Sequence, residues 1–444
     1  MNLASYRLAA SCADYRRLAR QRLPRFLFDY IDGGANDEQT LRANCEDLQC
    51  LNLRQRVLRD VDNLDTRCEL LGQAASMPLA LAPLGMAGLY ARRGEVQAAR
   101  AAAAVGVPFS LSTVGICSLA EVHAATVQKC WFQLYMLRDR DAVQGLLQQA
   151  RRNGCDTLLF TVDLPVAGIR RRDIRNGMLD ASWRGRLAKA TQLAQRPGWL
   201  LDVGIRGKPH HFGNLSDRVA DPSDLHAFKA WLDAQFDPRV SWDDIRWLRA
   251  QWPGRLVLKG IMEPDDALRA LDCGADGIVV SNHGGRQLDG VASTIQQLPA
   301  VVEALGGRLP ILLDGGIRSG VDLLRALALG AQGVLIGRPW AWALAAGGEA
   351  AVVCWPACRP NWPRRWRCAA STAWNRSTPV CWSAATELVA LIGIRLLRRL
   401  VLVALQRDLA DRQAQLCRQH ALGHAFGHLA EVVVVAELAV GVGA

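Results

Sequence analysis

Short apolar runs alternate along residues 79–337 with longer stretches in which apolar residues recur at helical spacing. This alternation is typical of repeated strand–helix units, whose strands lie parallel in one sheet. The apolar runs predict eight strands, at residues 79–82, 108–112, 131–135, 157–162, 256–259, 277–281, 310–314 and 333–337. The intervening stretches predict seven helices, at residues 95–105, 119–126, 141–153, 243–251, 264–273, 295–305 and 320–329.

Eight such units predict an α/β fold, the TIM (β/α)8 barrel. An open doubly wound sheet is the alternative, because periodicity alone does not show that a sheet closes. An N-terminal helical segment precedes the barrel, and a long insertion at residues 176–240 follows the fourth strand. The insertion mixes Arg and Lys with Trp183, Trp199, Leu200 and Leu201. This mixture fits either a membrane-contact segment or an ordinary lid over the barrel mouth.

Composition narrows the classes of protein that remain. The chain has 444 residues and a formal net charge of +11, of which residues 351–444 supply a large part through eleven Arg and no Lys against five acids. No basic helix or aromatic platform accompanies the charge, so nucleic-acid binding is not predicted. The thirteen Cys lack metal-ligand spacing, so no metal site and no disulfide framework is predicted, and a reducing cytoplasmic setting fits. Arginines interrupt the apolar run at 388–405, which argues against a membrane span.

Polar residues gather at the predicted strand ends, where TIM barrels carry their active sites. After the sixth strand comes Ser-Asn-His-Gly-Gly-Arg-Gln at 281–287, in which His283 is placed to remove a proton while Arg286 holds an anion. Asp163, after the fourth strand, either orients that imidazole or caps the next element. Arg170 and Arg286 together suit bidentate capture of a substrate carboxylate.

Two glycine-containing loops follow the seventh and eighth strands. They are Asp314-Gly315-Gly316-Ile317-Arg318 and Gly337-Arg338. Backbone amides beside glycine, together with arginines after these two strands, form the usual phosphate site of a TIM barrel. The loops therefore predict a phosphorylated cofactor or substrate. Lys259, at the end of the fifth strand, provides a positive charge at the barrel mouth or a simple salt-bridge partner.

With these motifs the chain resembles the FMN-dependent L-2-hydroxy acid dehydrogenases and oxidases, and is most similar to the bacterial quinone-linked L-lactate dehydrogenases. The resemblance runs from about residue 6 to 348. It implies that His283 is the catalytic base, with Asp163 as its partner. It also implies four substrate-binding residues, Tyr30, Tyr135, Arg170 and Arg286. The FMN contacts that it implies are Pro83, Leu84, Gly85, Ser112, Gln133, Thr161, Lys259, Ser281, Asp314, Gly315, Gly316, Arg318, Gly337 and Arg338.

The same resemblance implies oxidation of L-lactate, or a similar small L-2-hydroxy acid, to the 2-keto acid with FMN as electron acceptor. A membrane quinone would then reoxidise the flavin, and a homo-oligomer would lie peripherally on the cytoplasmic side of the inner membrane, or otherwise in the cytoplasm. Within the family, a mandelate dehydrogenase and an O2-dependent 2-hydroxy acid oxidase remain alternatives. The sequence does not distinguish hydride transfer from a carbanion route.

The resemblance ends at about residue 350. Residues 354–382 are rich in Trp, Cys, Pro and Arg, and Pro356, Pro360 and Pro363 rule out the continuous helix that the family pattern requires. We therefore interpret residues 1–350 as the barrel domain and hypothesise that the atypical tail, 351–444, is the product of a frameshift. Loss of the last barrel helix would expose apolar surface. An inactive product without FMN, or a basic binding module acting through the tail, are the alternatives from other classes.

Overall fold

The computed structural model describes residues 3–53, 58, 65–166, 168–178, 180, 182–216, 231 and 234–354. Eight parallel strands form one sheet in the order β3-β10-β9-β8-β7-β6-β5-β4. Their bounds are β3 Leu79–Leu81, β4 Ser110–Ser112, β5 Trp131–Leu134, β6 Thr157–Thr161, β7 Arg255–Ile261, β8 Gly277–Val280, β9 Ile311–Leu313 and β10 Gly333–Ile336. A parallel bridge between Leu81 and Phe109 joins the two ends of this order. The sheet therefore closes, which confirms the barrel and makes the open doubly wound sheet wrong.

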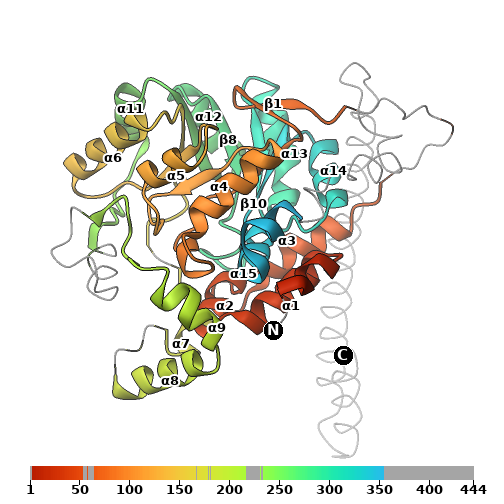
Figure 1. The fold of residues 1–444 in the computed structure, drawn as a ribbon. Helices are drawn as coiled ribbons and strands as arrows, with labels where there is room; N and C mark the ends of the chain where they lie inside the picture. Colours follow the sequence, from red (N-terminus) through yellow and green to blue (C-terminus); the bar gives the residue numbers. More distant parts are fainter. Residues whose placement is uncertain are drawn as a thin grey trace, which may run out of the picture. The chain divides into compact units, whose positions relative to one another are not determined.

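All seven helices predicted between the strands are confirmed, and they surround the barrel (Figure 1). They are α4 Gly94–Val105, α5 Leu119–Ala125, α6 Arg140–Arg152, α11 Trp242–Gln251, α12 Pro264–Asp272, α13 Thr294–Leu305 and α14 Gly320–Ala328. An eighth helix, α15 Arg338–Val353, follows β10 and packs against α1 and α4, with non-helical backbone at Gly347 and Gly348. This helix therefore covers the barrel wall after β10, and the described residues end at Cys354.

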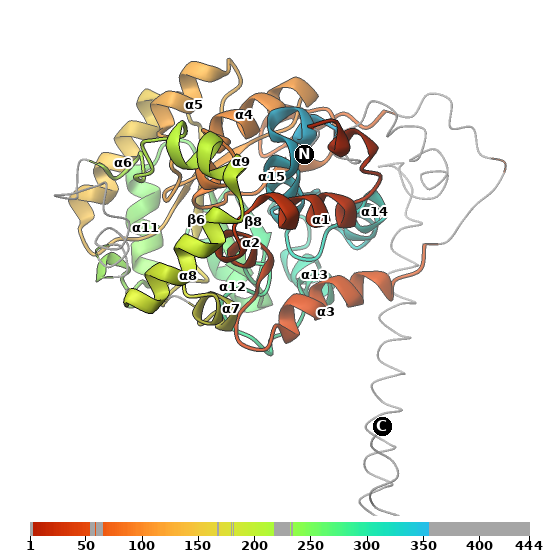
Figure 2. The same ribbon diagram turned by 60° about the horizontal axis from the view of Figure 1, so that its bottom comes forward.

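The N-terminal segment is helical, as predicted, and the insertion after β6 adds further helices. The N-terminal elements are η1 Leu3–Leu8, α1 Cys12–Arg22, α2 Arg25–Asp32 and α3 Gln39–Gln49. After β6 come α7 Arg171–Arg175, α8 Trp183–Ala194, α9 Pro197–Trp199 and the π-helical turn η3 Leu200–Ile205, and a short 3-10 turn, η2 Ala87–Leu89, follows β3. Helix α2 packs against both α7 and α8 (Figure 2). Segments far apart in sequence therefore meet beside the barrel opening.

Strand side chains alternate between the barrel interior and the helices, so every second residue points inward. One buried inner layer is apolar and consists of Ala80, Trp131, Leu159, Val257, Val279, Leu312 and Leu335. Two positions further along these seven strands come residues of the next layer, Ala82, Gln133, Thr161, Lys259, Ser281, Asp314 and Gly337. The strand register therefore places a polar layer at the carboxyl end of the barrel, where the sequence predicted the site.

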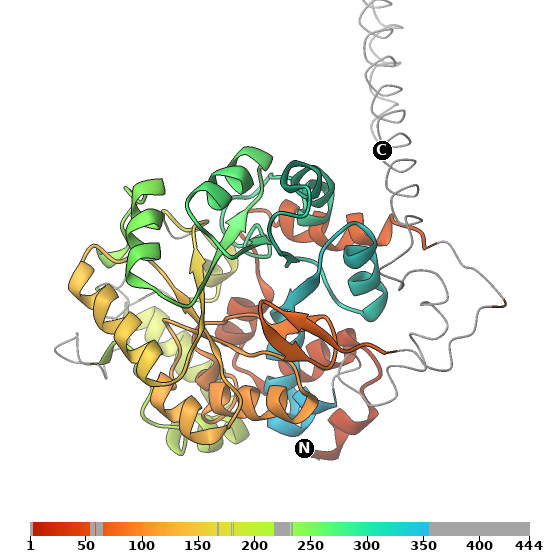
Figure 3. The ribbon, with the colours of Figure 1, turned by 90° about the horizontal axis from the view of Figure 1, so that it is seen from above.

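A two-stranded antiparallel hairpin, β1 Cys68–Leu70 and β2 Gln73–Ala75, was not predicted. It lies over the middle of the barrel in the view from above (Figure 3). Leu70 and Leu71 belong to the inner apolar cluster of the barrel. A Cβ at Gly277 would lie 2.8 Å from Leu71 Cδ2, and one at Gly333 would lie 2.7 Å from Leu70 Cδ2. These glycines at the strand starts therefore leave room for the hairpin to plug the amino end of the barrel.

Spatial contacts divide the chain into Met1–Ser377 and Thr378–Ala444. Every described residue belongs to the first unit. Of the atypical tail, only residues 351–354 are described, so the frameshift hypothesis stays a prediction. Part of the predicted insertion also lies outside the described residues. Among the described helices, none combines the length and the apolar character that crossing a membrane requires.

Candidate active site

A cavity of about 630 Å³ opens at the carboxyl ends of the strands. It brings together most of the residues that the sequence predicted for the site. These residues come from positions spread over almost the whole sequence of the barrel. Those that line it are Tyr30, Pro83, Leu84, Gly85, Gln133, Tyr135, Thr161, Arg170, Lys259, His283, Arg286, Asp314, Gly315, Gly316, Arg318, Gly337 and Arg338. The other three, Ser112, Asp163 and Ser281, lie directly behind this wall and bond to residues that line it.

His283 and Asp163 form a partly buried pair. Asp163 Oδ1 lies 2.7 Å from His283 Nδ1. Because an ionised carboxylate only accepts, Nδ1 carries the proton and Nε2 is left as the basic nitrogen. Burial lowers the pKa of His283, and Lys259 lowers it further, although Asp163 opposes both. The imidazole is therefore neutral at neutral pH, the state that a general base requires.

The backbone adapts to this pair at two positions. His283 itself has a φ of +57°. On the adjacent strand the pairing of β7 with β8 shifts register between Lys259 and Ile261, where Gly260 has a φ of +114°. A Cβ at Gly260 would lie 2.7 Å from Asp163 Cβ. The β-bulge and its glycine therefore make room for the carboxylate behind the imidazole.

Lys259 lies between two carboxylates at the centre of the polar layer. Its Nζ is 3.1 Å from Asp314 Oδ2, 4.0 Å from Asp163 Oδ2 and 3.0 Å from Ser281 Oγ. Burial alone would lower the pKa of Lys259, but Asp314 and Asp163 outweigh it and the pKa is raised. Burial likewise opposes ionisation of Asp163, yet His283 and Lys259 hold its pKa low. The site thus keeps one buried ammonium charged at the barrel mouth.

Next to Lys259 the polar layer continues as a chain of side-chain hydrogen bonds. Ser112 Oγ donates to Gln133 Oε1 at 2.9 Å, and Gln133 Nε2 donates to Thr161 Oγ1 at 3.0 Å. These bonds fix which end of the Gln133 amide faces each neighbour. All three side chains are buried. The floor of the cavity is therefore an ordered set of donors and acceptors instead of an apolar surface.

Two arginines flank Tyr30 at the side of the cavity. The guanidinium carbons of Arg170 and Arg286 lie 5.2 Å and 4.9 Å from the centre of its ring. Arg286 Nη1 also donates to the carbonyl oxygens of Tyr30 at 2.6 Å and Gly33 at 3.0 Å. Burial and the neighbouring Arg170 lower the pKa of Arg286, although Tyr30 and Asp173 oppose this effect. The pair is suited to receive a carboxylate.

The backbone of the loop after β9 requires its two glycines, because the loop packs closely against α3. Gly315 and Gly316 have φ values of +93° and +81°, and a Cβ at Gly316 would lie 1.8 Å from Asn44 O. Arg338 after β10 donates to three carbonyl oxygens, those of Ile31 at 3.1 Å, Gly33 at 2.8 Å and Gly284 at 2.9 Å. Burial, with Arg286 and Arg318 nearby, lowers the pKa of Arg338 to about 9.

Some residues that build the site were not predicted. Asn44 of α3 and Asn282 exchange two amide hydrogen bonds, at 2.8 Å and 2.9 Å, which fix α3 against the loop after β8. Asp173 is buried beside the arginines, 3.6 Å from Arg170 Nη1, and burial raises its pKa. Tyr90 Oη donates to Gly85 O at 2.8 Å. Asp173 was detectable as the one carboxylate among the arginines at 170–175, whereas the Asn44 contact spans 238 residues and leaves no local signal.

The charges of the cavity favour an anionic ligand. Among the described residues that line it are six cations, Arg170, Lys189, Lys259, Arg286, Arg318 and Arg338, and two carboxylates, Asp173 and Asp314. Asp314 Oδ1 is buried without a hydrogen-bond partner within the described chain. An ordered polar floor, a glycine-containing loop and an excess of cations over carboxylates together fit a cofactor with a polar ring edge and a phosphate. The residues present therefore fit FMN.

The fold and the site define a TIM-barrel enzyme with a phosphate-bearing cofactor and a His–Asp base. Residues 19–354 match the model of the FMN-dependent dehydrogenase family, and the chain belongs to that family, with FMN as its cofactor. It is 54% identical over 345 residues to an L-lactate dehydrogenase of Caulobacter vibrioides, covering 78% of this chain and 90% of the relative. A Chromohalobacter salexigens L-lactate dehydrogenase is 52% identical, with 78% and 88% covered.

Solved structures give the same result. A structure described as the monotopic membrane protein (S)-mandelate dehydrogenase superimposes with a TM-score of 0.77 at 35% identity, covering 82% of this chain and 96% of the other. A mandelate oxidase superimposes with a TM-score of 0.68 at 38% identity, with 81% and 94% covered. The predicted resemblance to this family is therefore confirmed.

Proposed function

We propose that this chain oxidises small L-2-hydroxy acids, L-lactate in particular, to 2-keto acids. One observation carries the proposal: the cavity with the hydrogen-bonded His283–Asp163 pair also holds two arginines around Tyr30. Oxidation of a 2-hydroxy acid needs both parts, a base that removes a proton and an anion site for the carboxylate. The L-lactate dehydrogenases that are 52–54% identical to this chain support the choice of substrate.

In this mechanism the arginines bind and orient the substrate. Arg170 and Arg286 hold its carboxylate beside Tyr30, and Tyr135 also lines the cavity. His283 Nε2 takes the proton, and the ionised Asp163 stabilises the imidazolium that results. FMN, when bound, would take up the two electrons of the oxidation together with the second hydrogen, so that the CH–OH group becomes a carbonyl. Its holding residues would be the polar floor with Lys259 for the ring, and the loops at 314–318 and 337–338 for the phosphate.

The visible spectrum of the purified full-length chain tests the proposal. We expect a yellow flavin spectrum that bleaches when L-lactate is added without oxygen. His283→Gln is the control variant, because it removes the base and leaves the floor and phosphate loops intact; it should stay yellow after L-lactate. A wild-type flavoprotein that does not bleach with L-lactate contradicts this choice of substrate. A colourless chain supports the alternative of an inactive product.

The mandelate enzymes among the structural neighbours make (S)-mandelate the second candidate substrate. The cavity is lined by Leu84, Met86 and Val114 in addition to its polar groups, and these side chains do not by themselves exclude an aryl substituent. Comparing kcat/KM for L-lactate and (S)-mandelate decides between the two. A higher kcat/KM for L-lactate than for (S)-mandelate supports the first candidate, and a lower one replaces it with the second.

We also propose that a membrane quinone reoxidises the enzyme, which docks on the membrane through the surface around α7, α8 and η3. Exposed apolar side chains gather there, namely Ile169, Ile174, Trp183, Leu187, Leu201 and Ile205. Ile169 and Ile174, each 61% exposed, also line the cavity, so this apolar surface borders its opening. The monotopic membrane neighbour supports this arrangement.

The acceptor is tested separately from the substrate. Enzyme reduced by L-lactate is mixed in stopped flow with air-saturated buffer or with a soluble short-chain quinone. Faster reoxidation by the quinone supports the dehydrogenase, whereas faster reoxidation by oxygen supports the O2-dependent oxidase. The predicted homo-oligomer and the location on the inner membrane remain proposals of the same resemblance.

A further inference from the structure

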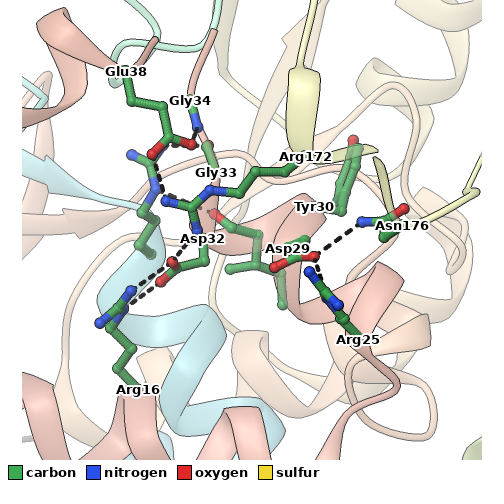
Figure 4. A network of polar contacts seen from close by, with 12 residues as sticks. Arg16, Arg25, Asp29, Tyr30, Asp32, Gly33, Gly34, Glu38, Arg172 and Asn176 are labelled. Carbon is green, nitrogen blue, oxygen red and sulfur yellow. Dashed lines mark hydrogen bonds and ion pairs between the residues drawn. The ribbon is translucent and has the colours of Figure 1, made fainter. Parts of the chain in front are cut away.

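A network of charged side chains joins α7 to the end of α2, outside the cavity (Figure 4). Arg172 Nη1 lies 2.8 Å from Asp32 Oδ2, and its other terminal nitrogen pairs with Glu38. Arg16 of α1 binds the same Asp32 carboxylate, through Nε at 2.5 Å and Nη2 at 2.7 Å. The Asp32 side chain is only 3% exposed, so this carboxylate is a buried joint between three segments.

The backbone of the loop that follows Asp32 contacts both the loop that carries Arg286 and the loop that carries Arg170. Its Gly33 carbonyl accepts from Arg286, and its Ala35 N–H donates to Gly285 O at 2.8 Å. On the other side Asn36 N–H donates to Ile169 O at 2.9 Å, one residue before Arg170. Glu38 holds this loop from within, since its Oε1 accepts from Gly34 N–H at 2.9 Å. Residues 30–38 thus connect the two loops that carry the carboxylate-binding arginines.

We propose that Arg172 is a positioning residue for the carboxylate site: by bridging Asp32 and Glu38 it fixes Arg170 opposite Arg286 across Tyr30. This inference rests on the proposed function. Helix α7 has five residues, too few to be stable by itself, so tertiary bonds determine where it lies. Arg170 immediately precedes it and makes no bond to residues 30–38 except the stacking on Tyr30 among the contacts described. Two side chains of α7 bond to residues 30–38, since Arg171 pairs with Asp37 and Arg172 with Asp32 and Glu38. Asp37 is exposed whereas Asp32 is buried, so we assign the distance between the two carboxylate-binding arginines to the Arg172 bridge.

Arg172→Ala tests the bridge, and Arg171→Ala is its matched control. Arg171 lies on the same helix and carries the same charge, but its partner is the exposed Asp37. Asp32 keeps Arg16 in the Arg172→Ala variant, so no buried carboxylate loses all its partners. We expect Arg172→Ala to raise KM for L-lactate about tenfold, with kcat within about twofold and unchanged FMN content. The dissociation constant of pyruvate, followed by the flavin difference spectrum, should rise in parallel. Arg171→Ala should change none of these.

A double-mutant cycle separates positioning from a general structural effect. An Arg170→Ala background already lacks one of the two carboxylate-binding arginines. Adding Arg172→Ala to it should therefore leave KM and pyruvate affinity unchanged. Additive effects on KM overturn the inference, and so does an Arg172→Ala variant that matches Arg171→Ala. Arg172→Lys should recover only part of the affinity, because one ammonium replaces a two-sided fork.

A second variant covers the case in which Arg172→Ala does not fold. Glu38→Gln retains the shape of the side chain and its bond to Gly34 but removes the charge facing Arg172. It should raise KM in the same direction and by less; an unchanged KM in this folded variant counts against the bridge. Wild-type flavoprotein that responds to neither L-lactate nor pyruvate overturns the proposed function itself, which the variants alone do not.

Discussion

The electrostatic surroundings of one residue, His283, set the pH range of the proposed reaction. Burial lowers the pKa of its imidazole from the ordinary value of 6.5, and Lys259 adds to this effect while Asp163 opposes it. A lowered pKa means that the neutral base persists to lower pH. We therefore expect kcat/KM for L-lactate to rise with pH and level off, with the midpoint of its acid limb below 6.5. A midpoint above 6.5 in a kcat/KM profile would contradict this assignment.

Asp163→Asn, which replaces the partner of His283, should shift the pH profile of kcat/KM and lower its plateau. The carboxylate raises the pKa of His283, so its loss shifts the acid limb to lower pH. An amide can also donate to Nδ1, which favours the wrong tautomer, and it does not stabilise an imidazolium. We expect kcat to fall by roughly 10²–10⁴-fold. FMN content is the control, and a kcat within tenfold of wild type with full FMN would show that Asp163 acts mainly as a helix or loop cap.

At the level of elements, the eight strands and seven helices were predictable because each repeats a local pattern, apolar runs or helical spacing. His283 and the loop at 314–318 were predictable because they follow such strands. The hairpin β1–β2 was not, since its strands read Cys-Glu-Leu and Gln-Ala-Ala and form no apolar run. The placement of the two arginines around Tyr30 was also not predictable. It depends on the Arg172–Asp32 contact, which joins residues 140 positions apart in the sequence. Nothing local records such a contact.

The hairpin that the sequence did not reveal should matter for stability and not for catalysis. Leu71 is buried at the amino end of the barrel, opposite the cavity. Leu71→Ala should lower the free energy of unfolding by about 2–5 kcal/mol, because it opens a hole where the plug meets Gly277. Thermal or urea unfolding measures the loss, and KM for L-lactate should not change. Glu69→Ala, at an exposed position of the same hairpin, is the control and should cost little.

At the scale of the whole molecule, the proposed acceptor requires that the cavity opening face a lipid surface. The apolar side chains on α8 lie near basic ones, with Arg184 stacked 5.4 Å from the Trp183 ring. Such a mixture binds at the interface of anionic membranes, where the rings enter the headgroup region and the arginines meet lipid phosphates. The electrostatic part weakens with salt, but the apolar part does not.

Sedimentation with vesicles of phosphatidylglycerol and phosphatidylcholine measures this contact. Wild-type chain should bind, more weakly as salt rises. The double variant Trp183→Ser/Leu187→Ser should bind at least about tenfold more weakly, because each side chain contributes of the order of 1–3 kcal/mol when buried. Val127→Ser is the matched control: Val127 is fully exposed but follows α5, at the amino end of the barrel, away from the cavity. If the double variant and Val127→Ser bind alike, the surface around α8 is not the docking face, and a quinone acceptor would have to reach the cavity by another route.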